Sequence, residues 1–236
     1  MNKGKLYLIP TIISEETQDQ VIPLQVLNTI KGLDYFLVEN PRTSRRFISS
    51  LKLGLNIESL SFEMLDKHTT QDKINELMQP IFSGKDMGVI SESGCPGIAD
   101  PGALAVEFAH KNEIQVIPLV GPSSILLALM SSGFNGQSFV FHGYVPIDKL
   151  ERQKKIKKME EDAVRLNQTQ LFMDTPYRNE SLFEALINDC NSKSLLSIAR
   201  DITGKRELIR TKKIEDWRKT ESVSLNKSPV IFALYH

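Results

Sequence analysis

Short apolar runs alternate with amphipathic segments along the first half of the chain. The runs are rich in Val, Ile, Leu and Phe, as buried strands are. The segments between them place apolar residues at helical spacing, as Ile74, Leu77, Met78 and Ile81 illustrate. Because strands that alternate with helices form βαβ units, the pattern predicts a mainly parallel sheet. The predicted strands lie at 5–9, 35–38, 59–62, 87–90 and 114–119, and the predicted helices at 21–30, 42–51, 70–82 and 104–111.

The same alternation starts again after residue 119. We therefore expect two α/β domains, an N-terminal domain at 1–119 and a C-terminal domain at 120–236. A short connection that contains Gly204 joins two apolar runs, so these two strands are expected to be antiparallel and the second sheet mixed. The predicted strands of this half lie at 138–142, 169–173, 195–199, 207–210 and 229–235, and the predicted helices at 125–131, 149–166, 182–190 and 214–219.

The stretch at 91–102 is the most unusual loop, because it is rich in Gly, Ser and Pro and follows a buried strand. Pro101 fits the first turn of the next helix, and Asp100 is placed to cap that turn. Gly94 and Gly97 allow backbone conformations that side chains hinder and let another molecule come close. A tight turn is the plain alternative, but open parallel sheets bind ligands at such loops. Neither GxGxxG nor GxxxxGK[ST] occurs here, which argues against a Rossmann or P-loop nucleotide site.

Four further loops follow predicted strands and are also expected to contribute to a crevice at the strand ends. They offer backbone amides, hydroxyls and small residues, which suit a ligand with a ribose and an adenine better than a triphosphate. No nucleophilic triad, zinc signature or paired-cysteine site is present, and the four scattered histidines are expected to be structural, so we expect no metal site. The four loops lie at 10–11, 121–124, 141–146 and 174–178.

Composition and charge narrow the class of protein. The chain has 236 residues, 41% hydrophobic and 25% charged, and no apolar run reaches the roughly 20 residues of a membrane span. Two distant cysteines and an N-terminus that leads straight into a strand predict a reduced, cytoplasmic protein without a signal peptide. Residues 1–148 carry 11 basic and 16 acidic side chains, whereas residues 149–220 carry 17 basic and 12 acidic ones. This asymmetry indicates a polyanionic partner for the second half.

Several of these loops together resemble one protein family. The stretch S-E-S-G-C-P-G-I-A-D-P-G at 91–102 is followed by G-P-S-S at 121–124, by Ser132-Gly133, and by F-V-F-H-G-Y-V-P at 139–146. This series resembles the tetrapyrrole methylase superfamily, and within it the branch of the 16S ribosomal RNA 2′-O-ribose methyltransferase I. The usual pattern of that branch is S-D-A-G-T-P-x-I-S-D-P-G, then G-P-S-A, S-G-L and F-x-F-x-G-F-x-P. Order and separation agree over about 55 residues.

The resemblance implies S-adenosylmethionine bound in a cleft between the two α/β domains, usually in a homodimer. The N-terminal domain would then hold the substrate side and part of the cofactor site, and the C-terminal domain the rest of that site and the dimer contacts. T-P-Y-R at 175–178 resembles the family's S-P-H-R, and A-R-D-I-T at 199–203 resembles A-R-E-L-T. By motif position, the residues that line the cofactor cleft are Pro10, Ser91, Ser93, Gly94, Cys95, Pro96, Ile98, Ser123, Ser124 and Tyr177.

The chain departs from the family pattern in two loops. The family's first loop, T-P-I-G-N-L, is replaced by P-T-I-I-S-E at 10–15, and its E-D-T-R is replaced by E-N-P-R at 39–42. Glu92 stands in the place of Asp and Cys95 in the place of Thr. Because the two loops lie in the half expected to receive the substrate, these changes bear on the methyl acceptor more than on the cofactor.

The sequence leaves the acceptor and the catalytic group open. We expect an S-adenosylmethionine-dependent methyltransferase that acts on RNA, as a homodimer with RNA or a ribosomal subunit as partner. The alternatives are a small-molecule, tetrapyrrole-like methylase and a cofactor-binding relic without catalysis. Asp100, Glu39 and Lys205 are the candidates for a catalytic base or electrostatic helper, by family position. The basic run at 149–158 is either a solvated helix face or a footprint for RNA phosphates.

Overall fold

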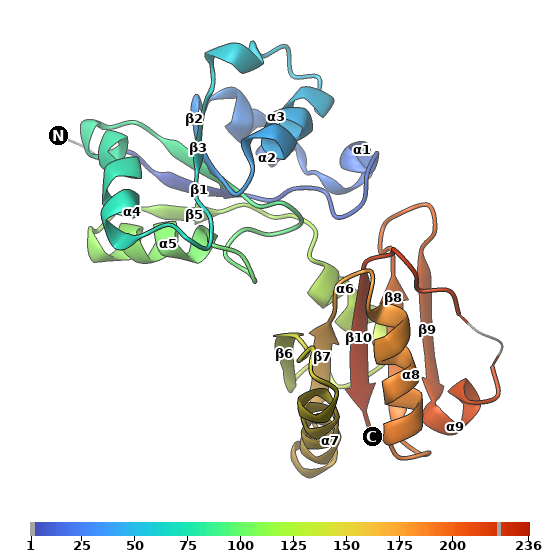
Figure 1. The fold of residues 1–236 in the computed structure, drawn as a ribbon. Coiled ribbons are helices and arrows are strands. Elements are labelled where there is room, and N and C mark those ends of the chain that lie inside the picture. The colour runs from blue at the N-terminus through green and yellow to red at the C-terminus, as the bar shows by residue number, and fades with distance from the viewer. Residues whose placement is uncertain (1–2, 221–222) are drawn as a thin grey trace. The chain divides into compact units, whose positions relative to one another are not determined.

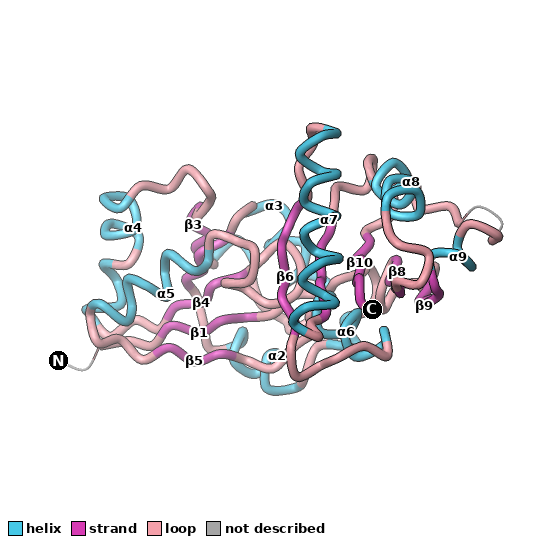
Figure 2. Tube along the Cα trace, turned by 90° about the horizontal axis from the view of Figure 1, so that it is seen from below, coloured by secondary structure: helices cyan, strands magenta, loops and turns pink. Residues whose placement is uncertain are grey.

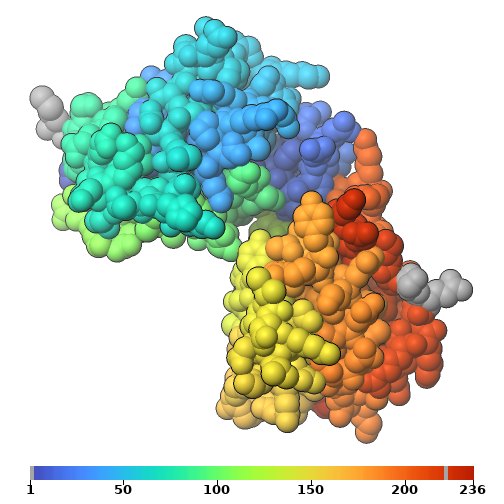
Figure 3. All heavy atoms as spheres, viewed as in Figure 1, coloured from blue at the N-terminus to red at the C-terminus, as the bar shows by residue number. Residues whose placement is uncertain are grey.

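The chain folds into two compact units, Met1–Ser123 and Ser124–His236, in a computed structural model that describes residues 3–220 and 223–236 (Figure 1). Each unit is built from one continuous part of the sequence, coloured blue to green for the first and yellow to red for the second (Figure 3). The units divide in the connection between strand β5 (Val116–Pro118) and helix α6 (Ser124–Ser132). The boundary expected after residue 119 falls in the same connection.

The first unit contains a sheet of five strands that are all parallel, in the order β3-β2-β4-β1-β5. Figure 2 shows β5, β1 and β4 side by side. The mainly parallel first sheet is confirmed. Its remaining strands are β1 (Leu6–Ile9), β2 (Tyr35–Val38), β3 (Ser61–Met64) and β4 (Met87–Ile90).

Successive side chains of these strands enter two separate cores, because side chains alternate between the faces of a sheet. On β2, Leu37 packs into one core, whereas Phe36 and Val38 pack into the other. Helices α4 (Gln71–Leu77) and α5 (Gly102–Lys111) cover the first core. Helices α2 (Leu24–Lys31) and α3 (Pro41–Ser50) cover the second.

Two predicted helices of this unit are interrupted. The helix expected at 21–30 begins only at Leu24, after Pro23, and a separate short helix, α1 (Gln18–Val21), precedes it. The helix expected at 70–82 is α4 followed by the 3-10 helix η2 (Gln79–Ser83). In both places a proline, Pro23 or Pro80, lacks the N–H group that a continuous α-helix requires. A further 3-10 helix, η1 (Ile57–Ser59), precedes β3, which begins two residues later than expected.

The second unit contains a mixed sheet in the order β6-β7-β10-β8-β9. Strands β6 and β7 are parallel, and the other neighbouring pairs are antiparallel, so the expected mixed sheet is confirmed. The pair around Gly204 is antiparallel, as predicted. The strands are β6 (Phe139–Tyr144), β7 (Thr169–Met173), β8 (Leu195–Arg200), β9 (Leu208–Lys213) and β10 (Val230–Tyr235).

Helices cover both faces of this second sheet. Strand β10 shows the alternation: Phe232 and Leu234 pack into one core, and Ile231 and Ala233 pack into the other. The first core is closed by α7 (Lys149–Leu166), α8 (Asn179–Asp189) and the short α9 (Ile214–Trp217), and the second by α6. Throughout the two described ranges, no helix combines the length and the apolar character that crossing a membrane requires.

Candidate functional site

The loops that follow β1 and β4 are joined by hydrogen bonds at the carboxyl edge of the first sheet. The two strands are parallel neighbours, so their carboxyl ends lie side by side. The Thr11 N–H group donates to the Gly94 carbonyl over 2.9 Å, and the Thr11 hydroxyl donates to the Ser91 carbonyl over 3.3 Å. Ser91 and Thr11 are both buried. The sequence-predicted loop at 91–102 is therefore held against the first loop of the chain.

The loop after β5 is held against the same place. The Cys95 thiol donates to the Pro122 carbonyl, with Sγ 3.3 Å from the oxygen. Gly121 lies so close to Pro10 that a Cβ atom at position 121 would be 2.2 Å from the Pro10 ring. Burial, and then the nearby Asp100 carboxylate, raise the pKa of the Cys95 thiol, so this sulfur is a protonated packing group and not a reactive thiolate.

Asp100 shapes the loop at 91–102 from inside. Its Oδ1 atom accepts from the Gly97 N–H group over 2.6 Å and from the Gly102 N–H group over 2.9 Å. Gly102 is the first residue of α5, so Asp100 accepts from the first N–H group of this helix, but the N-cap position belongs to Pro101, which was expected in the first turn. Gly97 has a φ angle of +81°, which glycine adopts at little cost. The Asp100 carboxylate is thus already engaged in fixing the backbone.

Glu39 is the other catalytic candidate in this unit, and it lies at the end of β2, beside the end of β4. It lines one small recess together with Asp100. Partial burial raises the pKa of the Glu39 carboxyl above its ordinary value, and Glu92, Asp100 and Asp66 raise it further, whereas Lys67 lowers it. A carboxylate with a raised pKa is a better proton acceptor, which is what a general base needs.

A cavity of about 480 Å³ lies beside these loops and is lined only by residues of the first unit. Its walls come from four places: the loop after β1, the first residue of α1, helix α3, and the first two residues after β4. This size is typical of pockets that bind small molecules or parts of larger ones. The lining residues are Thr11, Ile12, Ile13, Ser14, Glu15, Glu16, Gln18, Thr43, Ser44, Arg46, Phe47, Ser50, Ser91 and Glu92.

One hydrogen bond joins two walls of this cavity. The Thr43 hydroxyl on α3 donates to the Glu92 carboxylate in the loop after β4, and it also lies 3.0 Å from the Asn40 carbonyl. Helix α3 begins at Pro41 because Pro suits the first helical position, and the Asn40 side chain caps it by accepting from the Arg42 N–H group over 2.9 Å. The divergent E-N-P-R segment therefore forms a regular helix start that positions Thr43.

The structure separates the sequence-predicted residues into two sets. The first set lies together at the carboxyl edge of the first sheet, and the second lies in the second unit. Within the first set, Ile98 is 48% exposed, whereas Ser91 is 7% exposed. The first set is Pro10, Ser91, Ser93, Gly94, Cys95, Pro96, Ile98 and Ser123, with the catalytic candidates Glu39 and Asp100. The second set is Ser124, Tyr177 and the catalytic candidate Lys205.

Tyr177 lies on a loop that an internal ion pair stabilises. The buried Asp174 carboxylate accepts from the Arg178 guanidinium, with Nε 2.8 Å from Oδ1. This pair spans the loop between β7 and α8, and it leaves the Tyr177 side chain 80% exposed. An exposed tyrosine on a fixed loop is available to contact a ligand or a partner. Ser124 is the first residue of α6, and Lys205 is exposed in the connection between β8 and β9.

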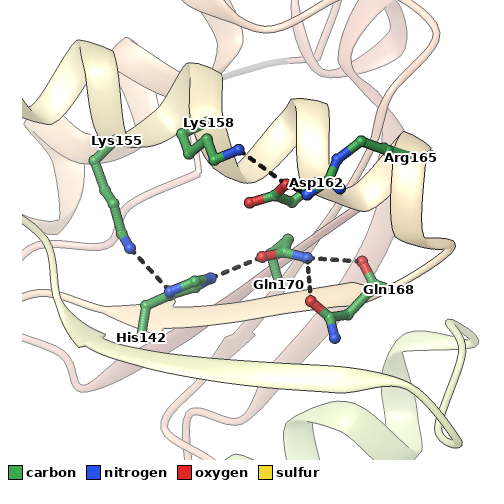
Figure 4. A network of polar contacts seen from close by, with 7 residues as sticks. All are labelled: His142, Lys155, Lys158, Asp162, Arg165, Gln168 and Gln170. Carbon is green, nitrogen blue, oxygen red and sulfur yellow. Dashed lines mark hydrogen bonds and ion pairs between the residues drawn. The ribbon is translucent and has the colours of Figure 1, made fainter.

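The basic run at 149–158 forms the first half of α7, and several of its lysines are paired (Figure 4). Lys155 Nζ lies 3.0 Å from His142 Nδ1, and Lys158 Nζ lies 3.1 Å from the Asp162 carboxylate. Lys154 Nζ lies 2.8 Å from Glu151. Among the described residues, the basic side chains of this run that form no such hydrogen bond or ion pair are Lys149, Arg152 and Lys157.

Sequence reasoning missed the helical wall of the cavity, which is formed by Thr43, Ser44 and Phe47. Thr and Ser on a helix form no recognisable motif, and only the neighbouring change at 39–42 pointed to this place. In the part of the chain that the structure describes, no group of three or more His, Cys, Asp or Glu side chains could hold a metal ion.

Comparison with known proteins gives curated relatives at about 30% identity. No family model matches the chain. The chain is 30% identical over 200 residues to the ribosomal RNA small subunit methyltransferase I of Streptococcus pyogenes serotype M6, and 30% identical over 205 residues to that of Bacillus subtilis. These matches cover 85% and 86% of this chain. The chain spans 65% of the length of each of these two curated relatives.

Solved structures share the fold at lower sequence identity. A diphthine synthase superposes with a TM-score of 0.68 at 12% identity, covering 98% of this chain and 89% of its own. The methyltransferase CobJ superposes with a TM-score of 0.63 at 16% identity, covering 98% of this chain and 99% of its own. At such identities the likeness shows the two-unit α/β fold and nothing more.

Proposed function

From the homology of the chain to the ribosomal RNA small subunit methyltransferase I proteins, a branch of the tetrapyrrole methylase superfamily, we propose that it is an S-adenosylmethionine-dependent methyltransferase that acts on RNA. The observation that carries this proposal is the loop cluster at the carboxyl edge of the first sheet. There, the family's central motif at 91–102 is held by hydrogen bonds against the loops that follow β1 and β5. The proposed acceptor is a ribose 2′-hydroxyl of ribosomal RNA, by resemblance to the same relatives.

The chemistry of the loop cluster fits the proposed cofactor. S-adenosylmethionine supplies an electrophilic methyl group on a positively charged sulfur. The edge of the sheet carries the carboxylates of Glu39, Glu92 and Asp100, which mutually interact and favour a cation nearby. The cofactor residues proposed on this unit are Pro10, Ser91, Ser93, Gly94, Cys95, Pro96, Ile98 and Ser123. Ser124 and Tyr177 of the second unit complete the proposed set by their motif positions.

Glu39 is the catalytic base that the geometry favours. Transfer to a hydroxyl breaks the bond from sulfur to methyl and forms a bond from methyl to the acceptor oxygen, in line, while the hydroxyl proton passes to a base. Asp100 already accepts two backbone N–H groups, so its role is to fix the loop. Glu39 has a raised pKa, and its carboxylate forms no hydrogen bond within residues 3–220 and 223–236, which supports it as the proton acceptor.

Methyl transfer from a labelled donor tests the function directly. The purified chain is incubated with methyl-labelled S-adenosylmethionine and, in parallel, with small ribosomal subunits, free ribosomal RNA and a small-molecule extract. The proposal expects label in RNA, in an alkali-resistant dinucleotide, because a 2′-O-methyl group leaves no 2′-hydroxyl to attack the neighbouring phosphodiester. Label only in the extract would replace RNA by a small-molecule acceptor, and cofactor binding without any transfer would identify a binding protein without catalysis.

The same resemblance supports two further features. Members of this family usually form homodimers, and the ribosomal substrate is cytoplasmic. Sedimentation of the purified chain at several concentrations measures the first feature, with a dimer as the expected species. The charge of the second unit agrees with an RNA partner, since residues 149–220 carry a net charge of +5.

A further inference from the structure

The cavity of the first unit has a chemistry of its own, distinct from that of the neighbouring loops at 93–98 and 121–123. Only Thr11 and Ser91 belong to both the cavity and the hydrogen-bonded loop cluster. The other walls come from the residues after Thr11, from α3 and from Glu92. Residues 12–15 and Glu92 are among the departures from the family pattern, and α3 begins inside the changed segment at 39–42. The inference below rests on the proposed function, because it concerns the acceptor of that reaction.

Negative charge predominates around this cavity. The carboxylates of Glu15, Glu16 and Glu92 line it, and Arg46 is the one cation among its lining residues. A phosphate group would be repelled by this excess of carboxylates, because like charges at short distance are unfavourable. A neutral or positively charged group is therefore the better occupant.

The hydroxyl groups of the cavity add hydrogen-bond acceptors and few donors. The Thr11 hydroxyl donates to the Ser91 carbonyl, and the Ser50 hydroxyl donates to the Phe47 carbonyl over 2.7 Å. The Thr43 hydroxyl donates to Glu92. A hydroxyl whose proton is already donated to one hydrogen bond can still accept another. A ligand that enters this cavity thus meets mainly acceptors and must supply the donors.

Ser44 provides an independent sign that the cavity receives a polar ligand. Its side chain lines the cavity and is only 3% exposed, and its hydroxyl forms no hydrogen bond to any residue in the described ranges. Its oxygen is not one of the fully enclosed polar atoms without a partner in the described residues, so it keeps access to the cavity, where a ligand or water can form a hydrogen bond with it. Phe47 and Ile13 supply apolar surface beside it, which suits the flat face of a base.

We propose that this cavity binds the methyl acceptor through an uncharged or cationic group that donates hydrogen bonds, such as an amino-bearing base, and that Glu92 selects it. Carboxylates accept well from exocyclic amines of bases. The hydrogen bond from Thr43 holds the Glu92 carboxylate at the cavity wall, so its remaining lone pairs point to a fixed acceptor position. Glu92 is thus a specificity-determining residue, and Thr43 is the residue that positions it.

Matched nucleosides test this preference. Binding of cytidine against uridine, and of adenosine against inosine, is measured on the full chain by saturation-transfer NMR in the presence of excess S-adenosylhomocysteine. Each pair differs by an amine in place of a carbonyl. We expect the amine-bearing member to bind about fivefold or more tightly, and Glu92→Gln to bring the two members of each pair close together. Glu58→Gln, an exposed carboxylate of the same unit outside the cavity, is the control and leaves the ratio unchanged.

A cavity-filling variant locates the binding. Ile13→Trp places a large ring in the cavity from a partly exposed loop position, and it should abolish nucleoside binding while S-adenosylhomocysteine still binds. Leu24→Trp, at a position that is 69% exposed and does not line the cavity, is the matched control.

Three results overturn the inference: equal binding within each pair, tighter binding of the nucleoside monophosphates than of the nucleosides, or no nucleoside binding at millimolar concentration. Loss of S-adenosylhomocysteine binding in Ile13→Trp also overturns it, because the cavity would then belong to the cofactor. Failure of the wild-type chain to bind S-adenosylhomocysteine contradicts the proposed function instead, and the preference between nucleosides is still measured.

Discussion

Lys155 on helix α7 points its ammonium group at the ring of His142 on strand β6, with Nζ 3.0 Å from Nδ1 (Figure 4). The other ring nitrogen lies 2.7 Å from the Gln170 amide oxygen, so Nε2 carries the proton and Nδ1 accepts from Lys155. A second proton on His142 would face the lysine charge directly. The basic run of α7 is therefore partly engaged inside its own unit.

His142 should titrate below the ordinary histidine pKa of about 6.5. Burial lowers its pKa most, Lys155 lowers it further, and the Gln170 hydrogen bond and Asp162 act in the opposite direction. Because the folded pKa lies below the unfolded value of about 6.5, the stabilisation by neutral His142 is complete above that pH and is lost as the pH falls through the folded pKa. NMR titration of the ring proton measures the pKa, and Lys155→Met should raise it. A His142 pKa at or above the ordinary value of about 6.5 contradicts the contact.

The effect of charge reversal on RNA binding should depend on which cations of α7 are changed. Within the described residues, the side chains of Lys149, Arg152 and Lys157 form no hydrogen bond or ion pair, so they can reach phosphates without breaking one. Changing these three to Glu should weaken RNA binding and flatten the salt slope by about 0.7 to 0.9 per lost contact. The matched control reverses the paired Lys154 and Lys158, and it should have the smaller effect. Filter binding at several salt concentrations measures the RNA affinity and its salt slope. Unchanged slopes in both variants would mean that the cations of α7 contact solvent and not RNA.

Substitutions of Glu39 and Asp100 should have different effects, the first on catalysis and the second on stability. Glu39→Gln removes the proposed base and should lower kcat for methyl transfer by about 100-fold or more, with unchanged affinity for S-adenosylhomocysteine. Single-turnover transfer and calorimetry measure the two quantities. Full activity of Glu39→Gln would exclude it as the base.

Asp100→Ala should act on folding. It removes the acceptor of the Gly97 and Gly102 N–H groups, and the free energy of unfolding of the first unit should fall by about 2 kcal/mol. Urea denaturation measures this loss. Asp100→Asn keeps an oxygen at this position and should retain most of the stability. An equal loss in both variants would point to the charge and not to the two hydrogen bonds.

The contact between Gly121 and Pro10 should tolerate no methyl group. A Cβ atom at position 121 would lie 2.2 Å from two atoms of the Pro10 ring, so Gly121→Ala must push the two loops apart. We expect a loss of about 1 to 3 kcal/mol in stability and weaker binding of S-adenosylhomocysteine. Gly136→Ala is the control, because nothing lies within 4 Å of a Cβ atom there. Thermal unfolding with and without the ligand compares the two, and equal behaviour would remove this contact from the account.

The sequence predicted the bounds of helices and strands well where the spacing of apolar residues and the residues that end the element agree. The strands 35–38 and 169–173 and the helix 149–166 agree with β2, β7 and α7, because each combines a clear period with a clear stop. The resemblance to the tetrapyrrole methylases and the parallel and mixed sheets are also confirmed. The predictions of two continuous helices were wrong. The apolar spacing continues through Pro23 and Pro80, but a proline lacks the N–H group that a continuous helix requires.

The site could be predicted only in its loops. Gly, Pro and Ser at 91–102 form a motif that can be recognised in the sequence. In the structure, hydrogen bonds join this loop to Thr11 and, through Cys95, to Pro122. The cavity wall at Thr43 and Ser44 could not be predicted, since a hydroxyl on a helix has functional meaning only once the opposite wall is in place. The assignments of cofactor and catalytic residues stay predictions.

Binding of S-adenosylhomocysteine, followed by hydrogen exchange, tests the central claim most directly. The account predicts a heat of binding for the wild-type chain and slower exchange of the amides at 93–95, 97, 98, 121 and 123. The edge strand β3 lies outside the proposed site, and its amides should be unchanged. No binding at millimolar concentration, or protection confined to segments away from these loops, would contradict the account.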